Sequence, residues 1–532
     1  MRAISDPGAL LRSVQPATGP AFARDPLAHL SPADQLLFEH FGKGPAIAPA
    51  LECIHYAFEA HAAATPAAIA VEHMGAQITY GELDRQASAL AALLVHHGVK
   101  PGDHVALFVL RSIPMIVGLL ATLKAGAAYV PQHVGVAPDA QLRHVIATAG
   151  TRVILTLASL RHLVPVPDGH VAIEIDSFMH THAELAAPRI EPSGESGCFV
   201  LFTSGTTGKP NGVTVTHKNV CNILLTAPGD LGIQPGMRVA QILSIAFDMA
   251  AWEILGCLAH GATLVIRGKS IDDAVRAADV VIATPSILGQ LDAAACRNIK
   301  VAAVAGEPCP RPLADAWSAF ATFYNSCGPT ETTIVNTMQH YTARSHRLTI
   351  GKPTPNNTVY VLDDELRAMP IGEVGEMWAG GDCVSAGYLA NDELNADRYR
   401  LDPFLGGGRM MFRTRDLGRW TGDGELEHLG RTDDQVKVRG FRVELDSVSR
   451  VLEQQAGCTQ AVTLKLDDRT LVAFVAPRDV DVAAAHARVE AQLPYYAVPA
   501  FVRALDELPL TGRGKLDKRA LLLMAQHDGG VS

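Results

Sequence analysis

The sequence predicts an α/β protein with a large N-terminal domain built on mainly parallel sheets and a small C-terminal α+β domain. Three observations support this prediction. Apolar strand segments alternate with helical segments from residue 51 to about residue 430, which is typical of parallel sheets covered by helices. After that point a hairpin pattern lies between two helical patterns. The length of 532 residues also suffices for one large and one smaller domain.

Composition and charge exclude several classes of function. Hydrophobic residues make up 48% and charged residues 19% of the chain, which fits a soluble globular protein. The net charge of −10 argues against a broad surface for nucleic acid or anionic membrane. The best apolar run, 112–123, is too short to span a bilayer, and the N-terminus lacks the apolar region of a secretory signal. Nine cysteines without a CxxC pair favour reduced thiols. We therefore expect a cytoplasmic protein without nucleic-acid or membrane partners.

The elements of the large domain follow in chain order. Residues 1–50 carry scattered Pro, Gly and Ala, and are expected to form an extension or linker with one short amphipathic segment around 33–41. The large domain is then expected to cover 51–432. Leu83, Ala87 and Leu94 have the spacing of one helix face. Strands are predicted at 105–110, 127–130, 152–155, 263–266, 279–283 and 301–305, and further helices at 113–124 and 139–149.

The small domain is expected to cover 433–525. Leu445, Val448 and Val451 define the apolar face of a helix that ends by Gly457. The segments VTLKL and LVAFV then flank a charged turn, as in a hairpin, and another helix is predicted at 482–493. Residues 526–532 form the predicted tail.

The segment FVLFTSGTTGKPNGVTVTH at 199–217 has the most informative composition. Its glycines allow close approach of the backbone to an anion, while N–H groups and hydroxyls can donate to phosphate oxygens. Only two residues separate Gly205 from the Gly208 and Lys209 pair, so the loop is not a Walker A motif. A solvated turn remains the alternative on composition alone. The candidate phosphate-binding residues are Thr203, Ser204, Gly205, Thr206, Thr207, Gly208 and Lys209.

This loop resembles the phosphate loop of adenylate-forming enzymes, specifically of the amino-acid adenylation domains of nonribosomal peptide synthetases. The resemblance extends over nearly all of 51–525. It implies the adenylate-forming fold, with a hinge between its two domains. Further segments similar to the family's motifs are ITYGEL at 78–83, LKAGAAYVP at 123–131, FDMAAWEI at 247–254, NSCGPTETT at 325–333, GEVGEMWAGGDCVSAGYL at 372–389, FRTRDLGRW at 412–420, GRTDDQVKVRGFRVEL at 430–445, LPYYAVP at 493–499 and LTGRGKLDKRAL at 510–521.

The resemblance implies a reaction and its cofactors, ATP and Mg²⁺. A substrate carboxylate attacks the α-phosphate of ATP to give acyl-AMP and pyrophosphate, and the acyl group then passes to a thiol. Because two anions meet, the site needs placed positive charge more than a general base. Lys515 matches the lysine that bridges carboxylate and α-phosphate. Without the resemblance, Lys515 would be an exposed lysine in a basic turn.

The resemblance also assigns residues around the nucleotide. Glu331 matches the carboxylate that holds Mg²⁺, which prefers oxygen ligands; its alternative is a role at a helix N-terminus. Asp416 matches the ribose-binding aspartate, with a surface salt bridge as the alternative, and Asp433 matches the hinge. The other residues implied at the nucleotide are Asn325, Cys327, Gly328, Thr330 and Arg431.

Asp248 matches the aspartate that pairs with the α-ammonium of an amino-acid substrate. A lone aspartate before a helix would otherwise be an N-cap. The remaining wall is apolar except for one hydroxyl, so we expect a neutral amino acid no larger than phenylalanine, aliphatic before aromatic. The wall positions implied by the resemblance are Met249, Trp252, Ile282, Ala303, Ala305, Ser326, Ile334 and Val335.

Three departures from the family pattern concern the nucleotide site. Asn211 stands where a lysine is usual, Cys327 where a tyrosine is usual, and Arg415 where a turn glycine is usual. These departures support one alternative, a catalytically weak binding or regulatory relative. An acyl-CoA ligase of the same fold is the other alternative, and Asp248 counts against it.

The expected acyl acceptor is the phosphopantetheine thiol of a carrier protein. No carrier-like segment follows Lys515, so the prediction is a stand-alone enzyme that loads a separate carrier in nonribosomal peptide or antibiotic biosynthesis. A small accessory activator protein is a further partner that this prediction allows.

Overall fold

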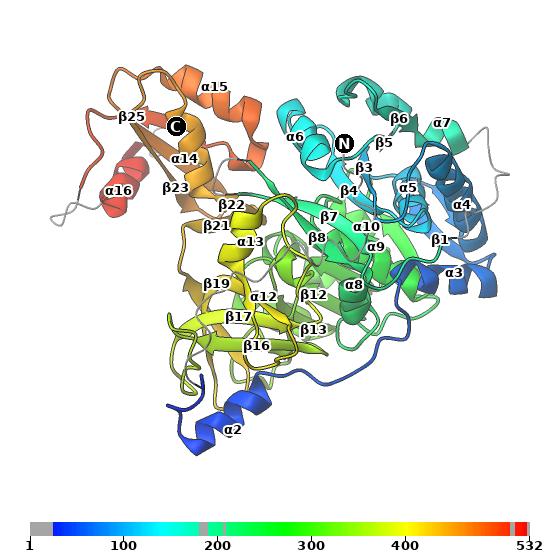
Figure 1. Ribbon diagram of the computed structural model, residues 1–532, viewed down its shortest axis with the longest axis horizontal. Helices are drawn as coiled ribbons and strands as arrows, with labels where there is room; N and C mark the ends of the chain where they lie inside the picture. The colour runs from blue at the N-terminus through cyan, green and yellow to red at the C-terminus, as the bar shows by residue number, and fades with distance from the viewer. Residues whose placement is uncertain (1–24, 180–189, 206–208, 511–515, 529–532) are drawn as a thin grey trace. The chain divides into compact units, whose positions relative to one another are not determined.

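The computed structural model describes residues 25–179, 190–205, 209–510 and 516–528 (Figure 1). The chain divides into two compact units. The first comprises Met1–His133, Thr148–Leu201 and Gly212–Thr432, and the second comprises Val134–Ala147, Phe202–Asn211 and Asp433–Ser532. The last boundary therefore lies immediately before Asp433, the residue that the family resemblance suggests as a hinge.

A six-stranded sheet carries the first part of the predicted strand and helix alternation. Its strand order is β6-β5-β3-β4-β7-β8, and the pairs β3 with β4, β3 with β5, β5 with β6 and β4 with β7 are parallel. The strands are β3 (His104–Val109), β4 (Ala128–His133), β5 (Val153–Thr156), β6 (Val171–Glu174), β7 (Gly197–Thr203) and β8 (Asn211–Thr216). The helices between and beside them are α3 (Ile54–Ala64), α4 (Tyr80–His96), α5 (Ile113–Lys124), α7 (Ile175–Met179) and α8 (His217–Leu224). Helix α6 (Asp139–Ala149) follows β4 in the chain and belongs mostly to the second unit.

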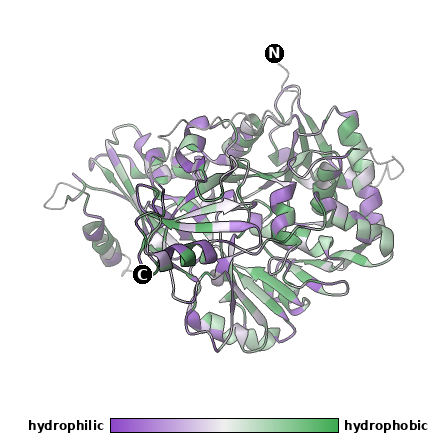
Figure 2. Ribbon diagram, turned by 60° about the horizontal axis from the view of Figure 1, so that its bottom comes forward, coloured by the Kyte–Doolittle hydropathy of each residue, from purple (hydrophilic) through white to green (hydrophobic). Residues whose placement is uncertain are grey.

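The predicted helix face is confirmed in α4, where Leu83, Ala87, Leu90 and Leu94 are buried. Thr79 caps this helix by accepting from the backbone N–H of Glu82. Several helices carry both hydrophobic and hydrophilic residues (Figure 2), as expected for helices that cover a sheet on one side.

A nine-stranded sheet carries the second part of the alternation. Its order is β15-β14-β13-β12-β11-β9-β10-β1-β2, and it is parallel from β1 through β13, with antiparallel strands at both edges. The strands are β1 (Ile69–His73), β2 (Ala76–Thr79), β9 (Arg238–Gln241), β10 (Thr263–Ile266), β11 (Val280–Ala283), β12 (Val301–Val304), β13 (Thr322–Cys327), β14 (Thr337–Tyr341) and β15 (Lys352–Pro353). The associated helices are α9 (Asp248–Ala259), α10 (Ile271–Arg276), α11 (Pro285–Leu288) and α12 (Arg311–Ser318).

A five-stranded antiparallel sheet completes the first unit, and the sequence patterns did not predict it. Its order is β16-β17-β19-β18, with β20 also paired to β19. Helix α2 (Pro32–Phe41), in the segment predicted as an extension, packs on this sheet through Phe38. The elements are β16 (Asn357–Leu362), β17 (Gly375–Gly381), α13 (Asp392–Arg398), β18 (Tyr399–Leu401), β19 (Met410–Trp420) and β20 (Leu426–Arg431).

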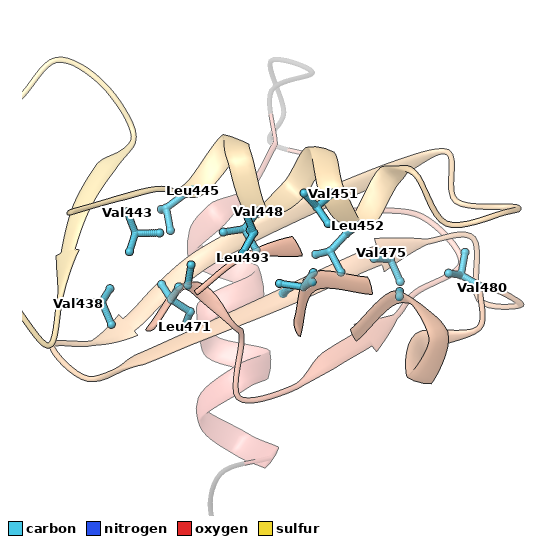
Figure 3. Packing of buried hydrophobic residues seen from close by; sticks show 14 residues of the cluster. Val438, Val443, Leu445, Val448, Val451, Leu452, Leu471, Val475, Val480 and Leu493 are labelled. Carbon is cyan, nitrogen blue, oxygen red and sulfur yellow. The ribbon is translucent and has the colours of Figure 1, made fainter. Parts of the chain in front are cut away.

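The second unit has its own apolar core, formed where α14 and α15 meet the sheet (Figure 3). The predicted helix face is confirmed, because Val448, Val451 and Leu452 are buried there. The predicted hairpin is confirmed as β23 paired antiparallel with β24. The elements are β21 (Gln435–Val438), β22 (Phe441–Glu444), α14 (Leu445–Glu453), β23 (Gln460–Asp467), β24 (Thr470–Ala476), α15 (Val482–Gln492), β25 (Val502–Ala504) and α16 (Lys518–Asp528).

Two buried histidines lie side by side in the first unit. His55 and His217 are 2% and 1% exposed, and their ring centroids are 5.2 Å apart. The Nδ1 atom of each ring is buried and has no partner among the described residues. Burial lowers the pKa of His217 to about 4, and burial together with the neighbouring His217 and Lys124 lowers the pKa of His55. Both imidazoles are therefore neutral at pH 7.

This pair predicts a loss of stability in acid. The unfolded chain binds a proton on His217 near pH 6.5, whereas the folded chain does so only near pH 4, so the free energy of unfolding falls as pH falls through this window. The shift corresponds to about 3 kcal/mol from His217 alone. Urea unfolding at pH 7 and pH 4.5 measures it, with His217→Phe as the comparison. Parallel pH dependence in the wild type and the variant would contradict the prediction.

Candidate functional site

Four of the predicted wall residues lie on one face of the nine-stranded sheet. Ile282 on β11 pairs with Ala303 on β12, and Ala303 pairs with Tyr324 on β13. Side chains two residues apart in a strand share a face, so Ala305 and Ser326 lie on the same side, one step further along. The N–H of Ala305 donates to the carbonyl of Ala283 at 3.3 Å, which continues the strand register. All four wall residues are buried.

Helix α9 brings Met249 to the end of this face. A Cβ added at Gly306, the residue after Ala305, would lie 3.7 Å from the sulfur of Met249. Gly306 has a φ of +88°, a conformation that favours glycine. The end of β12 and the first turn of α9 therefore approach each other closely. Asp248 is the first residue of α9, and the N-cap position belongs to Phe247, so the alternative of Asp248 as the N-cap is not what the structure shows.

Trp252 and Glu253 anchor α9. Trp252 is fully buried and donates from Nε1 to the carbonyl of Gly229 at 2.7 Å. The Glu253 carboxylate accepts from the backbone N–H groups of Ile242 and Leu243 and from the side chain of Gln241. Burial raises the pKa of Glu253 to about 8, against the lowering effect of these donors. These contacts hold the start of α9, and thus Asp248, against the end of β9.

Ile334 and Val335 lie in a strained turn beside the GPTE segment. Thr333 and Ile334 have φ values of 55° and 68°, which are rare for β-branched residues. The Thr333 hydroxyl donates to the carbonyl of Cys383 at 2.8 Å, so a distant segment holds the turn. A Cβ added at Gly328 would lie 2.6 Å from the Cα of Val335. This close approach joins the predicted nucleotide segment to the predicted wall.

Glu331 is fully buried and held by the segment that follows β17. The Tyr388 hydroxyl donates to Oε1 of Glu331 at 2.6 Å, and the N–H of Ser385 donates to the carbonyl of Glu331 at 2.9 Å. The same segment pairs with β8, because Val213 forms a bridge with Tyr388. An oriented carboxylate is an oxygen ligand that suits Mg²⁺.

Asp416 lies on β19 in a polar cluster. Its Oδ1 accepts from Arg431 at 2.6 Å, and Nε2 of His428 lies 3.3 Å away. The side chains of Asp416 and Arg431 are 10% and 17% exposed, so this pair is mostly buried rather than a surface salt bridge. The hydroxyl of Thr414 accepts from the N–H of Asp416 at 3.0 Å and donates to the carbonyl of Met377 at 2.6 Å. Asp416 therefore has a defined orientation.

The structure accommodates two of the departures from the family pattern. Arg415 takes the left-handed conformation of a turn glycine, with a φ of 62°, and donates to Asp397 at 2.8 Å. The side chain of Asn211 packs against Gly205, where an added Cβ would lie 2.5 Å from the Asn211 amide nitrogen. A side chain at 205 would therefore displace Asn211.

The other predicted site residues have these positions. Cys327 is half-buried at the end of β13, opposite Thr337 on β14. Asn325 is buried and donates to the carbonyl of Thr349 at 2.7 Å. Thr330 begins a short 3₁₀ helix that ends at Thr332. Thr203 is the last residue of β7, and Ser204 and Lys209 lie on either side of residues 206–208, which are outside the described residues. The predicted residues Thr206, Thr207, Gly208 and Lys515 lie outside the described residues.

Sequence reasoning did not single out Tyr388, Ser385, His428 or Gly306. Tyr388 and Ser385 belong to the GEVGEMWAGGDCVSAGYL segment, which carries no charge pattern that would mark a contact with Glu331. His428 belongs to no segment chosen for its composition. Only the tertiary contacts distinguish these residues.

Comparisons with known proteins identify the family of this sequence. A family model described as AMP-binding enzyme matches residues 58–389, and one described as AMP-binding enzyme C-terminal domain matches residues 454–515. Adenylate-forming reductases 03009 and 06235 of Coprinopsis cinerea are 45% and 46% identical to the chain. Each alignment covers 94% of the chain and 49% of the relative. The chain thus spans about half the length of these two relatives.

Nonribosomal peptide synthetases are also relatives. Nonribosomal peptide synthetase 5 of Aspergillus fumigatus is 34% identical over 88% of the chain and 21% of its own length. A solved nonribosomal peptide synthetase protein with adenylation and carrier domains has a TM-score of 0.80 at 24% identity, covering 92% of this chain and 85% of that one. A fused adenylation and carrier di-domain from Klebsiella oxytoca has a TM-score of 0.77 at 23% identity, covering 85% of this chain and 93% of that one. The predicted adenylate-forming fold is thereby confirmed.

None of the helices in the described part of the chain combines the length and the hydropathy needed to cross a membrane.

Proposed function

Because this chain belongs to the family of AMP-binding enzymes, we propose that it activates a neutral amino acid as its aminoacyl-adenylate, consuming ATP and releasing pyrophosphate. The observation that carries this proposal is the buried face of Ile282, Ala303, Ala305 and Ser326, with α9 beginning beside it at Asp248. One carboxylate at the start of a helix, next to an apolar wall, suits a substrate with an ammonium group and an uncharged side chain. A charged side chain in this wall would lack a counter-ion.

The proposed nucleotide site uses the oriented carboxylates of the first unit. Asp416, held by Arg431 and Thr414, has a carboxylate suited to accept from ribose hydroxyls. Glu331, oriented by Tyr388, would be a ligand of Mg²⁺. The described residues contain no group of three His, Cys, Asp or Glu that could hold a metal, so the phosphates of ATP would supply further ligands. When bound, Mg²⁺ neutralises phosphate charge. Lys209 and Lys515 would add positive charge where the two anions meet.

We further propose a phosphopantetheinyl carrier protein as the acyl acceptor. Support comes from the nonribosomal peptide synthetases among the relatives and from the similarity to proteins that combine adenylation and carrier domains. The carrier would approach a cytoplasmic enzyme whose two domains turn about Asp433 between the half-reactions.

The hinge proposal predicts the effect of Asp433→Pro. Proline locks φ near −65°, so the variant would favour one of the two domain arrangements. We expect adenylate formation and carrier loading to be impaired to clearly different extents, with Asp433→Ala as a control that leaves φ free. Single-turnover assays of each half-reaction provide the measurement. Small and equal effects on both half-reactions would exclude the hinge role.

A second candidate function follows from the adenylate-forming reductases among the relatives. At 45% and 46% identity over 94% of the chain, they support the hypothesis that this chain is the adenylating part of such a reductase. The chain would then supply the activated acyl group, and reduction of that group would require a separate hydride donor as the reductant. Asp248 distinguishes the two candidate functions only if the substrate of the reductase has no amine, because its proposed partner is the substrate ammonium group.

ATP–pyrophosphate exchange with matched acids tests both candidates. The assay compares each of the twenty amino acids with its deamino analogue, for example leucine with 4-methylpentanoate. We expect the highest exchange with a neutral amino acid and weaker exchange with neighbours in size, because one methylene is worth only about 1–3 kcal/mol. Highest exchange with a charged amino acid, or with an acid lacking the amine, would overturn the amino-acid proposal. Preference for the deamino acids would favour the second candidate.

A further inference from the structure

The N-terminal arm, defined here as residues 25–48, is bound to the five-stranded sheet by main-chain hydrogen bonds. It precedes the segment matched by the family model, which begins at residue 58. Lys43 forms an antiparallel bridge with Thr358 on β16. The carbonyl of Gly42 accepts from the N–H of Val359, and the N–H of Gly44 donates to the carbonyl of Asn357, both at 2.9 Å. Because β16 ends the strand order, the arm pairs with an edge that would otherwise be open.

Two aromatic residues of the arm pack on opposite faces of this sheet. The Phe38 ring lies 5.7 Å from that of Tyr360, within a cluster that includes Trp378. The Phe41 ring lies 5.8 Å from that of Trp420 and packs against a different cluster, which includes Val359 and Val361. Successive residues of a strand point to opposite faces, so Tyr360 and its neighbours Val359 and Val361 mark the two sides. The arm therefore packs on both faces of the sheet next to its edge strand, β16.

The face contacted by Phe41 includes the strand that carries Asp416. Along β19, Thr414, Asp416, Gly418 and Trp420 are buried, whereas the residues between them are half-buried. On β20, His428 and Leu426 pair with Gly418 and Trp420 and lie two residues apart, so they share a face, and Nε2 of His428 lies 3.3 Å from Oδ1 of Asp416. Asp416 is therefore reached from the side of the sheet on which Trp420 lies. Phe41 also lies against Gly424 in the turn after β19, where an added Cβ would be 2.5 Å from the Phe41 ring. Phe41 thus packs against the end of β19 and its turn.

From this packing we infer that Phe41 is a positioning residue for Asp416. By packing on Trp420 it holds the second half of β19 in register, and so helps to fix the position of Asp416, whose carboxylate accepts from Arg431 and whose backbone N–H donates to Thr414. Phe38 packs on the opposite face, in a cluster that reaches β19 at Met411, before Asp416, and not at Trp420. The inference rests on the proposed function in so far as Asp416 binds the ribose of ATP.

Paired alanine variants of the full chain separate positioning from stability. Phe41→Ala and Phe38→Ala each remove one ring from the same helix, α2, and both should lower the midpoint of thermal unfolding. Leu36→Ala is the control, because Leu36 is 70% exposed on that helix. Phe41→Ala is expected to raise KM for ATP by about fivefold to tenfold, equivalent to part of one charge-assisted contact. KM for the acid substrate should stay unchanged, and Phe38→Ala should leave both KM values near those of the wild type.

Hydrogen exchange gives a second readout that does not depend on activity. The amides of 414–420 should exchange faster in Phe41→Ala than in Phe38→Ala, and Phe41→Tyr should restore protection and KM. If Phe41→Ala and Phe38→Ala had equal effects on KM for ATP and on hydrogen exchange of 414–420, the inference would be overturned. A wild-type protein without adenylation activity would instead refute the proposed function. Hydrogen exchange of the amides of 414–420 would still decide whether Phe41 stabilises β19.

Discussion

Alanine in place of Lys515 is expected to slow adenylate formation by about 10²- to 10³-fold, because the lysine meets charge that develops in the transition state. The fold is expected to remain intact. ATP–pyrophosphate exchange measures the rate, and thermal unfolding of the same sample measures the fold.

The neighbouring sequence offers a matched control for Lys515. Arg519 is an exposed cation four residues further along, in α16, and Arg519→Ala should leave the exchange rate close to that of the wild type. This comparison separates a placed charge from the general charge of the segment. Exchange by Lys515→Ala within a few-fold of the wild type would remove the lysine from the mechanism.

Loss of the Asp248 carboxylate is expected to lower kcat/KM for the amino-acid substrate by about 30-fold to several thousand-fold. Removing one partner of a desolvated charge pair costs about 2–5 kcal/mol, because the substrate ammonium is left without a counter-ion. Asp248→Asn keeps the size and polarity of the side chain, so its effect isolates the charge. The deamino acid of the same shape should lose much less, since it has no ammonium to pair.

Comparing the amino acid with its deamino analogue distinguishes loss of the ammonium partner from a general loosening of α9. A substitution that merely loosened α9 would lower kcat/KM for the amino acid and its deamino analogue alike. Gln241→Ala provides that control, because Gln241 donates to Glu253 at 3.0 Å and so supports the same helix. Equal losses for both substrates in Asp248→Asn would place the aspartate outside the ammonium site.

Local patterns in the sequence were enough to predict most elements of the parallel sheets. The predicted helix at 113–124 matches α5, and the predicted strands at 263–266 and 301–305 match β10 and β12 to within one residue. Such segments can be recognised in the sequence because a buried strand is a short apolar run and a covering helix repeats its apolar residues every three or four positions. Both signals are complete within about a dozen residues.

The five-stranded antiparallel sheet was not predicted from such local patterns. In β19, buried Thr414, Asp416 and Gly418 alternate with half-buried Arg415, Leu417 and Arg419. The alternation is therefore one of burial rather than of hydropathy, and hydropathy is what a sequence displays. The N-terminal arm was predicted in part, because the short amphipathic segment expected there forms α2. Its scattered Pro, Gly and Ala did not indicate the backbone contacts with β16 or the packing of Phe38 and Phe41.

The sequence by itself determined the α/β class, the two-part organisation and the ordered motifs that resemble adenylation domains, because these depend on residue type and local spacing. Only the tertiary structure decided which residues meet. The hydrogen bond from Tyr388 to Glu331 joins positions 57 residues apart, and the Phe41 contact with Trp420 joins the arm to the strand of Asp416. Contacts at such separations are set by strand order and register, which no local pattern encodes.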